Sequence, residues 1–354
     1  MPHWKAGKTD DQVLDDLKET QKQAAGDFAK DQAQSKGVKE NKKSALVIEN
    51  DFTPVEYDPQ YILMVNHLKK YFPIKGGMVS KTVGWVKAVD GVTFNLKRGT
   101  TMGLVGESGC GKTTTGRTIL RLSGDKTGGQ VLFNGQEIYD LSHKEMRAMR
   151  TKMQIIFQDP FSSLSPRLPV GEIIGEAVRE HDLVPKDQFE DYIDQVMDNC
   201  GLQPFHKDRY PHEFSGGQQQ RVGIARAFVS KPRVIFADEP TGNLDSITSK
   251  QVLYRMLQIS KQMGTTFVMV THEPELASCA DRIITILDGK VQSDVVQDPA
   301  TRERNREALF ASLEGNMRIG GDSASGEIHQ KTAAELASYA TPAAAAQQPK
   351  QPKP

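Results

Sequence analysis

The stretch GESGCGKT, residues 106–113, fits the phosphate-binding pattern GxxxxGK[ST]. An apolar run, 102–105, precedes it and a helical run, 114–122, follows it, so the pattern lies in the strand, loop and helix context that it requires. Glycines let backbone N–H groups face phosphates, Lys112 neutralises charge, and the Thr113 hydroxyl reaches Mg²⁺. The residues expected to hold the nucleotide here are Gly106, Glu107, Ser108, Gly109, Cys110, Gly111, Lys112, Thr113 and Thr114.

Outward from this loop, short β-rich runs alternate with helical stretches, which predicts an α/β fold. The runs expected to be strands are 61–65, 101–105, 153–157, 234–237 and 266–270. Apolar residues at helical spacing in 170–178 and 189–200 predict two helices. These indicate a small helical subdomain, about residues 165–230, inserted into the sheet domain.

Composition excludes several classes of protein. The 354 residues are 37% hydrophobic, with 45 Lys+Arg against 45 Asp+Glu, so no overall charge attracts nucleic acid. No apolar run approaches the roughly 20 residues that cross a bilayer, and the first residues lack a signal-peptide pattern, so we expect a cytoplasmic location. Cys110, Cys200 and Cys279 lie far apart, which speaks against a disulfide framework or a metal knuckle.

Both ends of the chain have a different character from the middle. Residues 1–58 mix charges of both signs and predict a mobile extension, although apolar residues from Val13 to Phe28 leave a partner-docking helix as an alternative. Residues 59–300 are expected to form the nucleotide-binding domain. Residues 301–354 are expected to be a C-terminal extension that becomes low in complexity from about Asn316.

A second chemical motif is the apolar run 234–237 followed by Asp238 and Glu239. Asp238 at a strand end is placed to hold Mg²⁺, directly or through water, and Glu239 to polarise the water that attacks a γ-phosphate. An ordinary polar strand end is the alternative.

The third motif is FSGGQ, residues 214–218, at the start of a helical run. Together and in this order, the three motifs resemble those of ABC ATPases, with Phe214 in place of the usual Leu. The resemblance covers about residues 60–292 and implies ATP hydrolysis by a P-loop NTPase. That fold has a RecA-like core, an inserted helical subdomain and an N-terminal antiparallel β subdomain. The resemblance also implies a second contact with nucleotide, made by Ser215, Gly216, Gly217 and Gln218.

Further positions carry over from the family. Gln158 matches the Q-loop glutamine, Asp245 the D-loop aspartate and His272 the switch histidine. Tyr71 precedes the phosphate loop by 35 residues, as does the aromatic residue that stacks on adenine; the adjacent Phe72 is the alternative. The resemblance thus implies catalytic roles for Glu239, His272 and Gln158, and Mg²⁺ contacts from Thr113, Gln158 and Asp238.

Within the family, the stretch QDPFSSLSPR, residues 158–167, is similar to the Q-loop of dipeptide and oligopeptide permease ATPases, most of all the F-type subunit. Peptide import is the implied function. The implied partners are a second ATPase of the D type, or otherwise a second copy, two membrane permease chains and, indirectly, an extracytoplasmic peptide-binding protein. The protein would lie peripherally on the cytoplasmic face of the membrane.

Two departures qualify this assignment. Residues 240–246, PTGNLDS, are more like ATPases of lipoprotein-release and antibiotic-export systems, so an exporter or a mechanotransmission complex remains the alternative. No Cys follows Cys279, so we expect no iron–sulfur cluster. A non-transport ABC ATPase is the other alternative, but the long insertion or second ATPase domain of such proteins is missing from this sequence.

Overall fold

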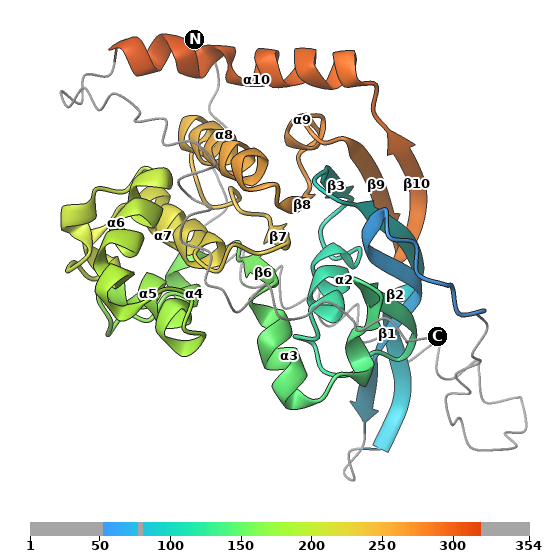
Figure 1. Ribbon diagram of the computed structural model, residues 1–354. Coiled ribbons are helices and arrows are strands. Elements are labelled where there is room, and N and C mark those ends of the chain that lie inside the picture. Colours follow the sequence, from blue (N-terminus) through green and yellow to red (C-terminus); the bar gives the residue numbers. More distant parts are fainter. Residues whose placement is uncertain (1–51, 77–80, 320–354) are drawn as a thin grey trace, which may run out of the picture. The chain divides into compact units, whose positions relative to one another are not determined.

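The computed structural model describes residues 52–76 and 81–319, all within one compact unit that begins at Asn50 (Figure 1). Most of the predicted N-terminal extension, including the apolar residues from Val13 to Phe28, lies outside the described residues. So does the predicted low-complexity tail from residue 320 onward.

Within the described residues, the central sheet is predominantly parallel and has six strands in the order β10-β9-β3-β8-β7-β6. Only the edge strand β10 is antiparallel to its neighbour. The strands are β3 (Thr101–Val105), β6 (Met153–Ile156), β7 (Val234–Asp238), β8 (Thr266–Thr271), β9 (Arg282–Leu287) and β10 (Lys290–Val296). The predicted α/β fold is therefore confirmed.

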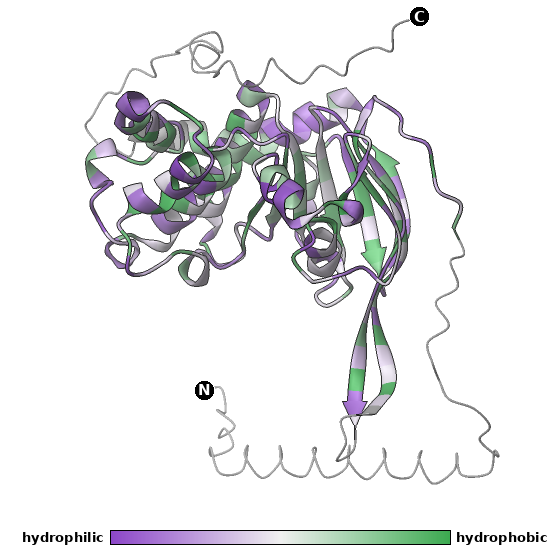
Figure 2. Ribbon diagram, turned by 60° about the horizontal axis from the view of Figure 1, so that its bottom comes forward, coloured by the Kyte–Doolittle hydropathy of each residue, from purple (hydrophilic) through white to green (hydrophobic). Residues whose placement is uncertain are grey.

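A second sheet is antiparallel, in the order β2-β1-β4-β5. Its strands are β1 (Tyr61–Gly76), β2 (Lys81–Lys97), β4 (Gly128–Phe133) and β5 (Gln136–Glu137). The run predicted at 61–65 is thus the first part of a longer strand. Figure 2 shows β1 and β2 continuing as a two-stranded ribbon beyond the rest of this sheet.

The helices cover both faces of the central sheet. They are α2 (Lys112–Ile119), α3 (His143–Arg150), α4 (Pro160–Ser163), α5 (Val170–Glu180), α6 (Phe189–Asn199), α7 (Gly216–Phe228), α8 (Ser246–Met263), α9 (Pro274–Ala277) and α10 (Pro299–Ile319). Helix α2 contacts β1, β2 and β7, so it lies between the two sheets. It ends at Ile119, earlier than the predicted 122, because Arg121 turns to a positive φ of 54°.

Alternating residues of the parallel strands divide the core in two. In β7, Ile235 and Ala237 join one hydrophobic cluster, and Val234 and Phe236 join the other. This is the period of two that a strand buried on both faces requires. The first cluster also contains residues of α5, α6 and α7, so the predicted helical region packs against the same face of the sheet.

The last described helix packs on the domain. Leu309, Phe310 and Leu313 of α10 are buried in the first hydrophobic cluster, and the Phe310 ring meets Tyr254 of α8 edge-on at 5.1 Å between centroids. Packed residues thus continue past 300, where the sequence analysis ended the domain. None of the helices in the described ranges has the length and apolar character needed to cross a membrane.

Candidate functional site

The phosphate loop joins β3 to α2 and depends on two glycines. At Gly106, where φ is 152°, a Cβ would lie 2.2 Å from the carbonyl oxygen of Ile286; at Gly111, where φ is 105°, it would lie 2.2 Å from that of Ala88. Only glycine fits such close approaches of backbone to backbone. The loop therefore curls tightly into the N-terminus of α2, where free N–H groups attract an anion.

Lys112 lies inside this loop. Its Nζ donates to the carbonyl oxygens of Gly106 and Glu107, each at 2.8 Å, and the residue is only 3% exposed. The same Nζ lies 4.0 Å from Oε1 of Glu239. A buried ammonium is thus held beside the loop that presents its amides to a phosphate.

Asp238 is the buried last residue of β7. Its Oδ1 accepts a hydrogen bond from the Thr113 hydroxyl at 2.6 Å, and its Oδ2 lies 3.4 Å from the Arg117 guanidinium. Burial raises the pKa of Asp238 above its ordinary value, although the bonds from Thr113 and Arg117 oppose the rise. A buried carboxylate next to a hydroxyl is a donor set that suits Mg²⁺, which prefers oxygen and one or two carboxylates.

Glu239 follows with a backbone φ of 46°, in the left-handed region that non-glycine residues seldom adopt. Its N–H donates to the Val270 carbonyl at 2.8 Å, which fixes the turn after β7 to the neighbouring strand β8. Its Oε2 accepts from Gln158 Nε2 at 3.2 Å and lies 3.3 Å from His272 Nδ1. The structure therefore brings the three predicted catalytic residues together.

Strand order explains this meeting. Gln158 follows β6, Glu239 follows β7 and His272 follows β8, and these three parallel strands are neighbours. The carboxyl ends of parallel strands share one edge of the sheet, which is where ligands of open α/β sheets bind.

The FSGGQ residues form the start of α7. Ser215 caps the helix by accepting from the Gln218 N–H at 3.4 Å, while Gln218 Oε1 accepts from the Ser215 N–H at 3.0 Å. A Cβ at Gly217 would lie 2.5 Å from Thr248 Cγ2, so this glycine lets α7 approach α8. In the described ranges, no hydrogen bond or ion pair links residues 215–218 to 106–114. Figure 1 shows α7 well apart from α2.

Asp245 caps helix α8. Its Oδ1 accepts from the N–H groups of Ile247 and Thr248 at 3.1 and 3.0 Å, and bonds from Thr248 hold its pKa below the ordinary value. Its predicted contact with nucleotide stays a prediction.

The two candidate adenine-stacking rings differ in exposure. Tyr71 is 9% exposed, its hydroxyl donates to Asp90, and Lys87 Nζ lies over its ring at 5.4 Å. Phe72 is 39% exposed. The choice of Tyr71 over Phe72 therefore stays a prediction.

The sequence analysis missed several contacts in this region. Arg117 lies beside Asp238. The sequence spacing could have indicated it, because Arg117 comes four residues after Thr113 and so lies on the same face of α2. No sequence pattern indicated Gln220, whose Nε2 donates to the Phe157 carbonyl at 3.2 Å and connects α7 to the Gln158 loop. No sequence pattern indicated Asn243 either, although its Nδ2 donates to the Gln158 carbonyl at 3.4 Å.

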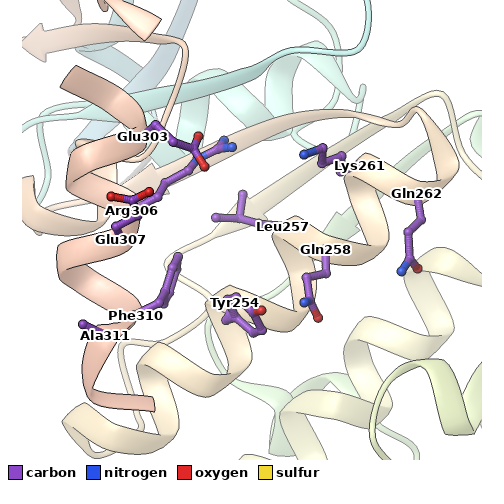
Figure 3. A pocket seen from close by; sticks show the side chains of 10 residues that line it. All are labelled: Tyr254, Leu257, Gln258, Lys261, Gln262, Glu303, Arg306, Glu307, Phe310 and Ala311. Carbon is purple, nitrogen blue, oxygen red and sulfur yellow. The ribbon is translucent and has the colours of Figure 1, made fainter. Parts of the chain in front are cut away.

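A separate groove of about 700 Å³ lies between α8 and α10 (Figure 3). Its lining consists of Tyr254, Leu257, Gln258, Lys261, Gln262, Glu303, Arg306, Glu307, Phe310 and Ala311. None of these residues belongs to the predicted site. Among the described residues, no three His, Cys, Asp or Glu side chains gather as a metal-ligand group. The absence of an iron–sulfur cluster remains a prediction.

Comparison with known proteins found a matching family model and similar transport proteins. The family model described as ABC transporter matches residues 89–242, a range that contains the phosphate loop, Gln158, the FSGGQ motif and Glu239. An oligopeptide transport ATP-binding protein of Bacillus subtilis, AppF, is 44% identical over 232 residues, which are 65% of this chain and 70% of the relative.

Two further similarities extend this result. A glutathione import ATP-binding protein of Pectobacterium atrosepticum, GsiA, is 35% identical over 308 residues, which are 80% of this chain but 49% of the relative. The chain thus spans about half the length of that protein. A dimeric ATP-binding cassette, MJ0796, solved in a post-hydrolysis state with ADP and Pi, is 28% identical with a TM-score of 0.59; the match covers 66% of this chain and 98% of the cassette.

Proposed function

The chain belongs to the family of ABC transporter ATP-binding proteins, and we propose that it hydrolyses ATP to energise import of di- and oligopeptides through separate membrane permease chains. The observation that carries the hydrolysis is the convergence of Gln158, His272 and Lys112 on the Glu239 carboxylate, at the edge of the sheet where the phosphate loop also opens.

Each side chain has a distinct role in this proposal. Lys112 and the amides at the start of α2 bind the phosphates and offset their charge. Glu239 accepts a proton from the attacking water, and His272 orients the carboxylate and the γ-phosphate. Thr113 and Asp238, with Gln158, would hold Mg²⁺, which would supply positive charge to offset the charge that develops on the phosphate.

The separation of the FSGGQ motif from the phosphate loop supports a dimer. Because α7, which begins at these residues, lies apart from α2 of the same chain, we infer that residues 215–218 contact a nucleotide held by a second ATPase subunit, arranged head to tail. That subunit is a related D-type chain or a second copy. The structural relative MJ0796 is itself a dimer.

Peptide import is supported by the relatives and by the loop after Gln158. AppF is named for oligopeptide transport, and GsiA for glutathione import. In this chain, the loop continues into α4, where Phe161 is 64% exposed and offers an apolar contact to a membrane partner. Two permease chains would hold the ATPase at the cytoplasmic face of the membrane, and an extracytoplasmic peptide-binding protein would act on the far side.

Export is the second candidate, and one observation favours it: the residues Thr241, Gly242 and Asn243 resemble those of export systems. These residues adjoin Glu239 and Gln158, whereas α4 offers the more exposed surface for a membrane partner. We therefore give the α4 loop more weight in assigning the direction of transport.

Uptake of labelled peptides tests the proposal. A strain that lacks this chain should lose uptake of di- to oligopeptides and recover it with the wild-type gene but not with Glu239→Gln. Normal peptide uptake in the deletion strain, together with retained lipoprotein or failed drug efflux, would overturn import and favour export.

A further inference from the structure

The side chain of Gln158 is held in place by the turn that follows Glu239. Within that turn, the Gly242 N–H donates to the Glu239 carbonyl at 3.0 Å, and the Leu244 N–H donates to that of Thr241 at 3.0 Å. The Ser249 hydroxyl also donates to the Thr241 carbonyl, at 3.2 Å. Gly242 is therefore fixed relative to Glu239.

Gly242 provides room for the Gln158 amide. A Cβ at this position would lie 3.1 Å from Gln158 Nε2, a tight contact that requires the amide to shift by a few tenths of an ångström, and 3.6 Å from its Cγ, an ordinary contact. The backbone of Gly242 does not need glycine, because its φ lies outside the left-handed region. Space for Gln158 is thus the physical consequence of having no side chain here.

The Asn243 side chain holds the Gln158 loop through a main-chain carbonyl of that loop. Its Nδ2 donates to the Gln158 carbonyl, while Gln220 of α7 holds the preceding carbonyl, that of Phe157. Gln158 is consequently anchored from the turn after β7 and from α7, and its amide points at Glu239 Oε2.

We propose that Gly242 and Asn243 are positioning residues of a resting latch, in which the Gln158 amide occupies the Glu239 carboxylate until ATP draws it away. The proposal rests on the assignment of Glu239 as the base for ATP hydrolysis. A carboxylate that accepts a bond from Gln158 is less free to accept a proton from water. The latch thus competes with the ATP-bound arrangement and lowers the fraction of complexes that hydrolyse ATP.

The latch is exposed to solvent at Gln158, Gly242 and Asn243, so its strength is that of an ordinary hydrogen bond. Loss of one such bond shifts an equilibrium by about 2- to 10-fold. Gly242→Ser and Asn243→Ala are therefore expected to raise basal ATP hydrolysis about 2- to 10-fold at sub-saturating ATP, in the absence of transported substrate, and to tighten ATP binding by up to the same factor, because ATP must release the same bond.

The experiment uses the complex purified with its membrane chains and measures basal hydrolysis and binding of a fluorescent ATP analogue. Gly223→Ala is the matched control, because a Cβ there meets nothing within 4 Å. If Gly242 acts through Gln158, Gly242→Ser should have no effect in a Gln158→Ala background, whereas a merely structural role would give the same effect in both. Asn243→Asp, which loses the donor but keeps the shape, should behave like Asn243→Ala.

Basal hydrolysis that falls or stays constant in Gly242→Ser, or that rises equally in the Gln158→Ala background, would overturn the latch. Failure of the proposed function has a different signature: Glu239→Gln would then hydrolyse ATP at the wild-type rate. Because basal hydrolysis is measured without substrate, the result is independent of whether the complex imports peptides.

Discussion

The Thr113 hydroxyl donates a 2.6 Å hydrogen bond to Asp238 Oδ1 and so joins the first turn of α2 to the end of β7. Two motifs separated by more than a hundred residues thereby form one oxygen-rich site. The Asp238 carboxylate is buried, and burial raises its pKa, so keeping it ionised lowers the stability of the folded protein.

Asp238→Asn is expected to stabilise the nucleotide-free protein while abolishing Mg²⁺-dependent hydrolysis. Because the folded-state pKa of Asp238 is raised, the folded protein loses stability as pH rises from the ordinary value of 3.8 through the raised value. At neutral pH the full cost is present, and asparagine removes it while still accepting from Thr113. We expect a gain of about 0.5–2 kcal/mol in the free energy of unfolding.

Urea unfolding of the wild type and the variant at neutral pH measures this gain, and the difference should vanish below about pH 3.8, where both side chains are neutral. Asp125→Asn is the control, since the Asp125 side chain is 87% exposed. A variant less stable than the wild type at neutral pH would contradict the prediction.

Glu239→Gln is expected to keep ATP binding and to slow hydrolysis in the assembled complex about 10²- to 10⁴-fold, the usual contribution of a positioned base. At about 1.4 kcal/mol per tenfold, this is roughly 3–5 kcal/mol of transition-state stabilisation. Single-turnover hydrolysis measures the effect, and Glu275→Gln, an exposed carboxylate after β8, is the control. Near-normal turnover would mean that this site is not the hydrolytic one of the pair.

The sequence singled out the residues of the candidate site but not how the fold brings them together. Gln158, Glu239 and His272 were identified separately, each after an expected strand, but no local pattern states that β6, β7 and β8 are neighbours. Strand order depends on contacts far apart in the chain. The same limit applies to Gly242, whose closeness to Gln158 follows from the tertiary fold and is indicated by no local sequence pattern.

The ends of the domain show a second limit. The sequence analysis placed residues 301–354 in an extension, whereas the structure continues into α10. The apolar residues Leu309, Phe310 and Leu313 have helical spacing, but only the tertiary structure shows that they are buried in the core.

Phe310→Ala is therefore expected to lower the free energy of unfolding by about 3–5 kcal/mol, the usual cost of removing a buried aromatic ring. The loss includes the edge-on contact with Tyr254. Chemical denaturation measures it, with the exposed Glu307→Ala on the same helix as the control. A change below about 1 kcal/mol would show that α10 contributes little to the stability of the domain.

The last prediction concerns the adenine base. If Tyr71 stacks on it, the ATP base must displace the Lys87 ammonium that lies over the ring, and Tyr71→Ala should weaken ATP binding by about 1–3 kcal/mol, the usual value for base stacking on an aromatic residue. Tyr71→Phe keeps the ring and removes the hydroxyl that donates to Asp90, so its affinity for ATP should stay close to wild type. Titration with a fluorescent ATP analogue compares these variants with Phe72→Ala, whose ring is the more exposed. An affinity loss confined to Phe72→Ala would transfer the stacking role to Phe72, since adjacent residues of β1 direct their side chains to opposite faces.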